Sequence, residues 1–259
     1  KSLVTLDVAL FDRSPNHLNA RNGVINLRTG ELDPSRPKHC FTYCLPVAYD
    51  PEADTTPWLG FLNNTLNDDQ EMIEYLQEAV GYSITGHTWE ECLFYIHGPT
   101  RAGKGVFIET ILAMLGKEPL ATEVDFVTFT RHRDHDAQNF DLAPLKPCRF
   151  VAASESAEYE SLNAAKIKQL TGGNDVRCAF KYKDHFTYRP QFKIWLSSNY
   201  PPNVNVTDDA AWNRLRVIRF PNSYAGKEDK RLKVRLRQSE VLRGVLAWAV
   251  QGAGKWYQS

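Results

Sequence analysis

The chain lacks a net charge, a long apolar run and a paired set of cysteines. Its 31 basic side chains balance 31 acidic ones, so overall charge does not point to nucleic acid and any polyanion surface has to be local. No apolar run approaches the roughly 18 residues that span a bilayer, and no signal peptide is visible, so no membrane role and a cytoplasmic location are expected. Five scattered cysteines, an odd number without zinc-type spacing, favour a reducing compartment.

Apolar periodicity and turn signals predict three segments. Residues 1–87 carry a short strand at 24–27 between two turn signals and then two amphipathic helices, which predicts an α+β collar with a β-meander. Residues 88–221 alternate apolar strands with helices, as a layered α/β domain requires. In the C-terminal segment, 222–259, the basic run 227–243 predicts one helix, and a final apolar helix follows.

The most specific motif lies at residues 98–105, which read Gly-Pro-Thr-Arg-Ala-Gly-Lys-Gly. The spacing is that of a P-loop, G-x-x-x-x-G-K-[ST], except for glycine at the last position. A strand at 92–96 precedes the loop and helical apolar spacing follows it, which is the context the motif needs. Backbone N–H groups and the helix N-terminus would then hold nucleotide phosphates. The candidate ATP-binding residues are Gly98, Pro99, Thr100, Arg101, Ala102, Gly103, Lys104, Gly105 and Val106.

Glycine at position 105 removes the hydroxyl that normally binds Mg²⁺ in this motif. A water or a nearby hydroxyl could take that place, so nucleotide binding is better supported than fast hydrolysis. The structural alternative for the whole motif is a chance Gly-Lys pair in a surface turn.

Polar side chains follow two of the predicted strands. Glu155 comes directly after the apolar strand at 149–153, so it is placed at the carboxyl edge of the sheet, where it could hold the metal and orient water. Asn199 follows the strand at 192–196 and could hydrogen-bond the γ-phosphate or the attacking water. The alternatives are a helix cap for Glu155 and a turn role for Asn199.

Two arginines, Arg214 and Arg216, flank the start of a later strand. One of them is a candidate arginine finger for a neighbouring subunit's nucleotide, a group worth about 10³ to 10⁵ in rate. The alternative for each is a surface ion pair with Asp208 or Asp209, worth ~0–1 kcal/mol. Because Arg214 has no evident partner within the chain, we expect ring formation.

Apolar and basic residues alternate over 176–188, which predicts a β-hairpin. Its tip holds Lys181, Tyr182, Lys183 and His185, and cations beside aromatic rings suit a single-stranded phosphodiester chain. The alternative is an ordinary amphipathic hairpin with a solvated face.

The order of these motifs resembles superfamily III helicases of the AAA+ class, and more closely the helicase part of phage, plasmid and poxvirus-type primase-helicases. The runs that carry the resemblance are residues 152–156, 167–173, 180–183, 186–190, 192–199 and 212–220. The resemblance implies an AAA+ core with strand order 5-1-4-3-2 and a requirement for ATP and Mg²⁺. It also implies DNA unwinding by a hexameric ring around one strand.

The resemblance further implies a role for each candidate residue. Lys104 matches the lysine that binds phosphate, and Glu155 matches the Walker B acid that holds the metal. Asn199 matches the sensor residue, and Arg214 matches the arginine finger, a role for which Arg216 competes. Lys181 and Lys183 match the pore hairpin. The chain departs from the pattern at Gly105 and at Ser154, where an acid is usual.

Three functional hypotheses follow. The first is an ATP-dependent replicative helicase core that translocates on single-stranded DNA as a ring and unwinds forked DNA. The second is an ATP-binding DNA-binding or assembly module with little turnover, and a small-molecule kinase is a distant third. The chain begins at Lys1 rather than Met, which suggests a fragment, so a primase domain or partner is expected outside it.

Overall fold

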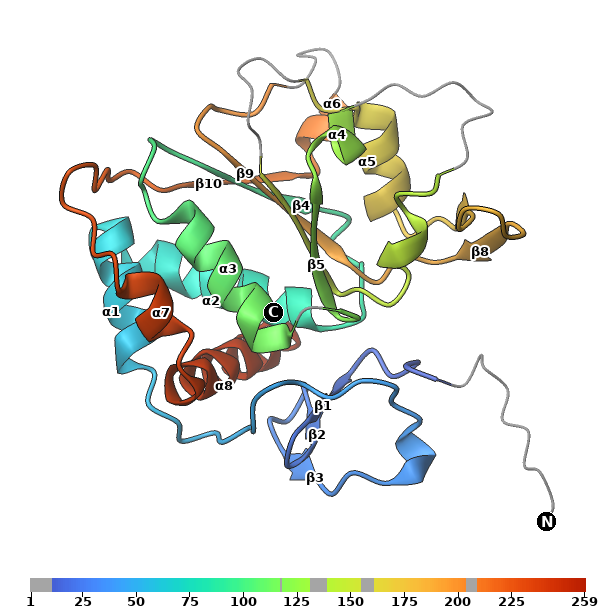
Figure 1. The fold of residues 1–259 in the computed structure, drawn as a ribbon, viewed down its shortest axis with the longest axis horizontal. Coiled ribbons are helices and arrows are strands. Elements are labelled where there is room, and N and C mark those ends of the chain that lie inside the picture. The colour runs from blue at the N-terminus through green and yellow to red at the C-terminus, as the bar shows by residue number, and fades with distance from the viewer. Residues whose placement is uncertain (1–10, 117, 131–138, 155–160, 204–208) are drawn as a thin grey trace.

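A five-stranded parallel sheet forms the centre of the computed structural model, which describes residues 11–116, 118–130, 139–154, 161–203 and 209–259 (Figure 1). Its strands, in the order in which they lie across the sheet, are β10 (Leu215–Arg219), β4 (Leu93–His97), β9 (Lys193–Ser198), β6 (Phe150–Ser154) and β5 (Ala121–Asp125). Every neighbouring pair is parallel, so all five carboxyl ends meet at one edge. The parallel α/β sheet expected from the sequence is therefore confirmed.

Both faces of this sheet are buried, because side chains that alternate along each strand enter two different hydrophobic clusters. In β4, Phe94 and Ile96 belong to one cluster, whereas Leu93 and Tyr95 belong to the other. This explains why the strand reads as a continuous apolar run rather than as an alternation of apolar and polar residues.

One face is covered by α3 (Lys104–Leu115) and by helices from the N-terminal and C-terminal segments (Figure 1). Those helices are α1 (Thr56–Leu66), α2 (Gln70–Ile84), α7 (Leu232–Leu236) and α8 (Ser239–Trp256). Helices α2 and α8 approach closely through glycines: a Cβ on Gly81 would lie 2.1 Å from Ala253 N, and one on Gly252 would lie 2.0 Å from Gln77 O. The N-terminal and C-terminal helices thus share a core with the sheet, and the segment boundaries at 87/88 and 221/222 stay predictions.

The other face carries shorter elements (Figure 1). They are α4 (Val127–Thr130), the 3-10 turn η3 (Ala143–Leu145), α5 (Ala164–Thr171), α6 (Asp209–Trp212) and a two-stranded hairpin of β7 (Val176–Cys178) and β8 (Phe186–Tyr188). Helix α5 is capped at its start by Asn163, whose side chain accepts a hydrogen bond from Lys166 N, and at its end by Gly172.

The predicted β-meander is present as β1 (His17–Ala20), β2 (Gly23–Asn26) and β3 (Leu32–Asp33), followed by the 3-10 turn η2 (Pro37–His39). The buried guanidinium of Arg149 ties it to the sheet, because it donates to the carbonyls of Ser14, His17 and Ile84 over 2.7 to 2.9 Å. A buried cation satisfied by carbonyls fixes the collar against the amino edge of the sheet.

The prediction of one helix over 227–243 is wrong. Helix α7 begins at Leu232, and α8 starts only at Ser239 after a break. The segment before α7 turns because Gly226 takes a φ of +78° and the Asp229 side chain accepts a hydrogen bond from Arg231 N. None of the helices in the described ranges has the length and apolarity that a membrane span needs.

Candidate nucleotide-binding site

The P-loop lies between the carboxyl end of β4 and the start of α3. Gly103 has a φ of +91°, a backbone conformation that favours glycine. At Gly98 there is no room for a side chain, because a Cβ there would lie 2.0 Å from Phe220 O. The glycines therefore shape the loop for the sharp reversal from strand to helix. The loop leads directly into the N-terminus of α3, where the first backbone N–H groups of a helix have no partner within the helix, as an anion site requires.

Lys104, the first residue of α3, points back into this loop. Its Nζ donates to Gly98 O over 2.7 Å, to Pro99 O over 2.8 Å and to Asn199 Oδ1 over 3.0 Å. The side chain is 7% exposed, and burial lowers the pKa of Lys104 from its ordinary value. The ammonium is thus held in place by carbonyl and amide oxygens, groups that a phosphate oxygen could replace.

Asn199 reaches Lys104 because β9 lies directly beside β4 in the sheet. Ser198 pairs with His97, so the residue after Ser198 leaves the sheet next to the first residue of the loop. The structure therefore brings together two of the predicted site residues, the phosphate lysine and the sensor asparagine. It does so at the carboxyl edge of the sheet, where ligands of α/β proteins bind.

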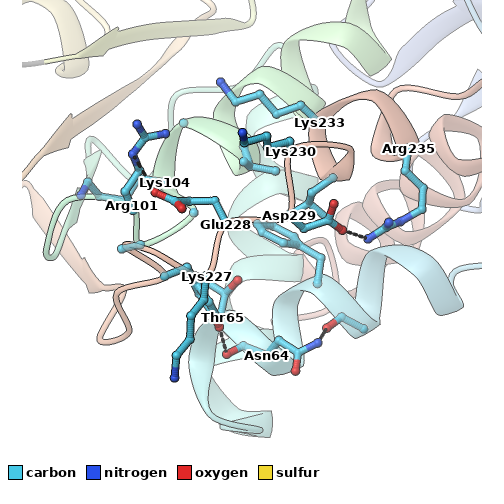
Figure 2. A pocket seen from close by; sticks show the side chains of 18 of the residues that line it. Asn64, Thr65, Arg101, Lys104, Lys227, Glu228, Asp229, Lys230, Lys233 and Arg235 are labelled. Atoms are coloured by element: carbon cyan, nitrogen blue, oxygen red, sulfur yellow. Dashed lines mark hydrogen bonds and ion pairs between the residues drawn. The ribbon is translucent and has the colours of Figure 1, made fainter.

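A cavity of about 930 Å³ opens beside the loop, large enough for a nucleotide (Figure 2). One wall is α1, with residues that include Phe61, Asn64 and Thr65, and the floor includes Lys104 and Asn199. Another wall is formed by residues of the C-terminal segment 224–235. Both walls were missed from the sequence.

The C-terminal segment is fastened to the P-loop by hydrogen bonds. Tyr224 N donates to Arg101 O over 3.1 Å, and Ser223 Oγ donates to Thr100 O over 2.9 Å. The Tyr224 hydroxyl also donates to Asn64 O over 2.6 Å, so the segment bridges the loop and α1. The basic composition of this run was visible in the sequence, but its place over the loop depends on these long-range contacts.

Charged pairs line the cavity (Figure 2). The P-loop residue Arg101 forms an ion pair with Glu228 at 3.7 Å, and Arg235 forms one with Asp229 at 2.9 Å. Burial, together with Arg219 and Lys104, lowers the pKa of His97 at the end of β4. The site is positive around the loop, which suits a polyanionic ligand.

The fit to Mg²⁺ is less complete than the fit to phosphate. Gly105 offers no hydroxyl, although a Cβ there would meet only Glu109 Oε1, at 3.8 Å. No group of three or more His, Cys, Asp and Glu side chains suited to a metal is found in the described part of the chain. Glu155 lies outside the described residues, so its role as metal ligand, and its position opposite Lys104, stay predictions. Ser154, the residue before it, ends β6 opposite Ser197 of β9.

The two candidate finger residues lie at the other end of the sheet. Leu93 N, at the start of β4, donates to Arg214 O, and Arg216 pairs with Phe94, so neither arginine is at the carboxyl edge that carries Lys104. The expectation that Arg214 has no partner within the chain is wrong, because its guanidinium forms an ion pair with Glu91 at 2.7 Å. Arg216 donates to Asn213 O over 2.7 Å.

The predicted hairpin is confirmed by the antiparallel pairing of β7 and β8. Its tip presents the four candidate DNA-binding residues to solvent, and they are Lys181, Tyr182, Lys183 and His185. Tyr182, which is fully exposed, has a φ of +63°. Below the tip, Phe180 stacks on Phe186 with ring centroids 5.6 Å apart. The tip thus exposes cations and aromatic faces together.

Two family models match separate parts of the chain. Residues 1–67 match the family described as D5 N terminal like, and residues 96–214 match a family of unknown function, DUF5906. The second match includes the P-loop, the hairpin, Asn199 and Arg214.

Relatives occur in large DNA viruses. The chain is 25% identical over 217 residues to "Putative helicase L207/L206" of Acanthamoeba polyphaga mimivirus, covering 83% of this chain and 22% of that protein. It is 23% identical over 239 residues to "Primase D5" of Fowlpox virus, covering 87% of this chain and 30% of that protein. The chain therefore spans less than a third of either relative.

The fold is similar to that of a solved structure, the apo form of the NrS-1 C-terminal region. The TM-score is 0.61 at 12% identity, and the match covers 81% of this chain and 50% of that one. This likeness concerns the fold alone. The D5 N terminal like match and the viral relatives, whose names include helicase and primase, support the resemblance to superfamily III primase-helicases that the sequence motifs indicate.

Proposed function

We propose that the chain is the ATP-binding motor core of a replicative DNA helicase, coupling ATP hydrolysis to translocation on single-stranded DNA. The observation that carries the proposal is the hydrogen bond from Lys104 Nζ to Asn199 Oδ1. It joins the phosphate lysine of the loop to a polar group just after the neighbouring strand, within reach of one bound phosphate. ATP with Mg²⁺ is the proposed ligand.

The strand order supports an AAA+ core. Counted along the chain, the strands of the parallel sheet run 5-1-4-3-2 across it. The P-loop follows strand 1 and Asn199 follows strand 4, so the order itself makes these two strand ends neighbours. An order with another strand between β4 and β9 would separate them.

The hairpin and the finger candidates support a DNA-binding ring. Lys181, Tyr182 and Lys183 at the hairpin tip offer ion pairing and stacking to a single strand. Arg214 lies at the end of the sheet away from its own P-loop, so it would serve the nucleotide of an adjacent copy rather than its own. A homo-oligomeric ring, proposed as a hexamer, would complete each site, and a primase domain would belong to the longer protein.

One observation favours the second candidate, an ATP-dependent assembly or DNA-binding module with little turnover. Position 105 has space for a larger side chain but holds glycine, so the usual Mg²⁺ hydroxyl is missing. Such a module would bind ATP and DNA tightly and release phosphate slowly.

The proposal is tested by DNA-stimulated ATP hydrolysis in the wild type and in Lys104→Ala. A matched control is Lys255→Ala, which removes an exposed lysine of α8 outside the cavity. The helicase proposal expects hydrolysis that DNA stimulates in the wild type and in the control, and a loss on the order of 100-fold in Lys104→Ala. Equal rates in all three proteins would dismiss it, and ATP-dependent DNA retention without phosphate release would select the second candidate.

A further inference from the structure

The cavity holds more positive charge than its own acids neutralise. Six cationic side chains line it: Arg101, Lys104, Lys227, Lys230, Lys233 and Arg235. Arg101 pairs with Glu228, Arg235 with Asp229, and Lys233 with Glu109 of α3 at 2.8 Å. Lys104 donates to the oxygens described above. Within the described ranges, the ammonium groups of Lys227 and Lys230 are the two of this set that have no acceptor.

The backbone on both sides of Lys230 is held in place. Before it, Glu228 is tied to Arg101 of the P-loop. After it, Asp229 Oδ1 accepts a hydrogen bond from Arg231 N over 2.9 Å, and the carboxylate of Asp229 also pairs with Arg235 of α7. These contacts restrain the backbone on either side of Lys230, so the entropy lost on binding an anion is mainly the rotamer freedom of its exposed side chain.

The two unpartnered lysines extend in different directions (Figure 2). Lys230 extends from the C-terminal segment toward the side of the cavity that holds Arg101 and Lys104, whereas Lys227 runs past Thr65 and away from Lys104. A phosphate chain that begins at the P-loop would thus approach the Lys230 ammonium rather than that of Lys227.

We propose that Lys230 is a second phosphate-binding lysine, which contacts the terminal phosphate of a nucleoside triphosphate whose other phosphates lie on the P-loop. This inference rests on the proposed function, because it assumes a nucleotide on Lys104. A triphosphate carries several negative charges, and a P-loop with glycine at position 105 offers one metal ligand fewer than usual to balance them. A lysine from the C-terminal wall of the cavity would supply positive charge at the end of the phosphate chain, where Mg²⁺ normally neutralises it.

The inference predicts discrimination between nucleoside triphosphate and diphosphate. Titration of the full chain with fluorescently labelled ATP and ADP, with Mg²⁺ present, measures both affinities. In Lys230→Ala we expect the ATP affinity to fall about tenfold, as for the loss of one charge-assisted hydrogen bond, and the ADP affinity to change by less than about threefold. Lys230→Arg should restore most of the ATP affinity.

Lys227→Ala is the matched control, since it removes an equally unpartnered lysine from the same segment. Its ATP and ADP affinities should remain within about twofold of the wild type. If Lys227→Ala and Lys230→Ala lose the same amount of ATP affinity, both lysines act only through the general positive charge of the cavity, and the inference is overturned. An unchanged ATP-to-ADP ratio in Lys230→Ala would also overturn it.

Failure of the proposed function gives a different result. If the wild type binds neither nucleotide, or if Lys104→Ala binds both as the wild type does, the P-loop is not a nucleotide site and the inference falls with it. If Lys104→Ala loses binding while Lys230→Ala keeps it unchanged for both nucleotides, the nucleotide site stands and only the role of Lys230 is rejected.

Discussion

Lys104 Nζ donates a hydrogen bond of 3.0 Å to Asn199 Oδ1, across 95 positions of sequence. The contact exists because β4 and β9 are neighbours and end at the same edge of the sheet. All three ammonium protons of Lys104 have oxygen acceptors in this arrangement. A bound phosphate would have to replace at least one of these oxygens, and Asn199 is the acceptor that belongs to a side chain. Its amide would then be free to turn toward the phosphate or a water.

The first prediction concerns Asn199→Ala. ATP binding should remain within a few-fold of the wild type, because the P-loop is intact, whereas hydrolysis should fall on the order of 100-fold if the amide positions the attacking water. The measurement is a pair of titration and steady-state hydrolysis assays. Asn213→Ala, an exposed change at the other end of the sheet, is the control. Equal hydrolysis in both variants would contradict the sensor role.

The second prediction concerns Gly105→Thr. The nearest atom to an added Cβ is Glu109 Oε1 at 3.8 Å, so the larger side chain should be accommodated. Because threonine restores a hydroxyl at the usual metal position, Mg²⁺-dependent hydrolysis should rise, by about tenfold if one metal ligand was limiting. Gly105→Ala adds the Cβ without the hydroxyl and should not show the gain. A Mg²⁺ dependence that is the same in all three proteins would show that another group already fills that place.

The third prediction concerns the neighbouring subunit. Lys104→Ala subunits lack a nucleotide site but keep Arg214, whereas Arg214→Ala subunits keep the nucleotide site but lack the arginine. If Arg214 acts on an adjacent copy, each variant alone should be nearly inactive and a mixture should recover a fraction of wild-type hydrolysis. A mixture whose activity is only the average of the two separate proteins would contradict action between subunits. Glu91→Gln, which removes the partner of Arg214 at 2.7 Å, should lower the protein concentration at which activity appears.

The fourth prediction concerns pH and His87. Burial, with Lys193, Arg28 and Arg149 nearby, lowers the pKa of His87 from 6.5 to about 4. Because the unfolded chain then binds the proton more tightly than the folded one, the free energy of unfolding should fall as pH drops from 6.5 toward 4 and level off below that.

The measurement for His87 is denaturant unfolding at several pH values. His87→Asn removes the titrating group, so its free energy of unfolding should depend less steeply on pH across this window. If the free energy of unfolding of His87→Asn depends on pH as steeply as that of the wild type, groups other than His87 cause the pH dependence.

Local patterns in the sequence predicted much of the fold. The apolar run before the loop, the turn signals around residues 24–27 and the alternation over 176–188 each appear as the expected strand or hairpin. These features depend on neighbouring residues, so a single sequence carries them. The long basic run was misread as one helix because helix propensity of the lysines and arginines outweighed the turn signals at Gly226 and Asp229.

Contacts between distant segments could not be predicted in the same way. The wall of the cavity formed by residues 224–235 depends on hydrogen bonds from Ser223 and Tyr224 to the P-loop, more than 120 positions away. The ion pair of Arg214 likewise depends on Glu91, which lies next to it only because β10 and β4 pair. In contrast, the meeting of Lys104 and Asn199 follows from the motif order once the sheet order is known.

The most direct test is a crystal structure of the full chain with Mg²⁺ and a non-hydrolysable ATP analogue. The account predicts phosphates in the loop of residues 98–105, with Lys104 Nζ moved from Asn199 to a phosphate oxygen and Glu155 facing it across the metal. A nucleotide bound elsewhere, or Lys104 and Glu155 on opposite sides of the molecule, would contradict it.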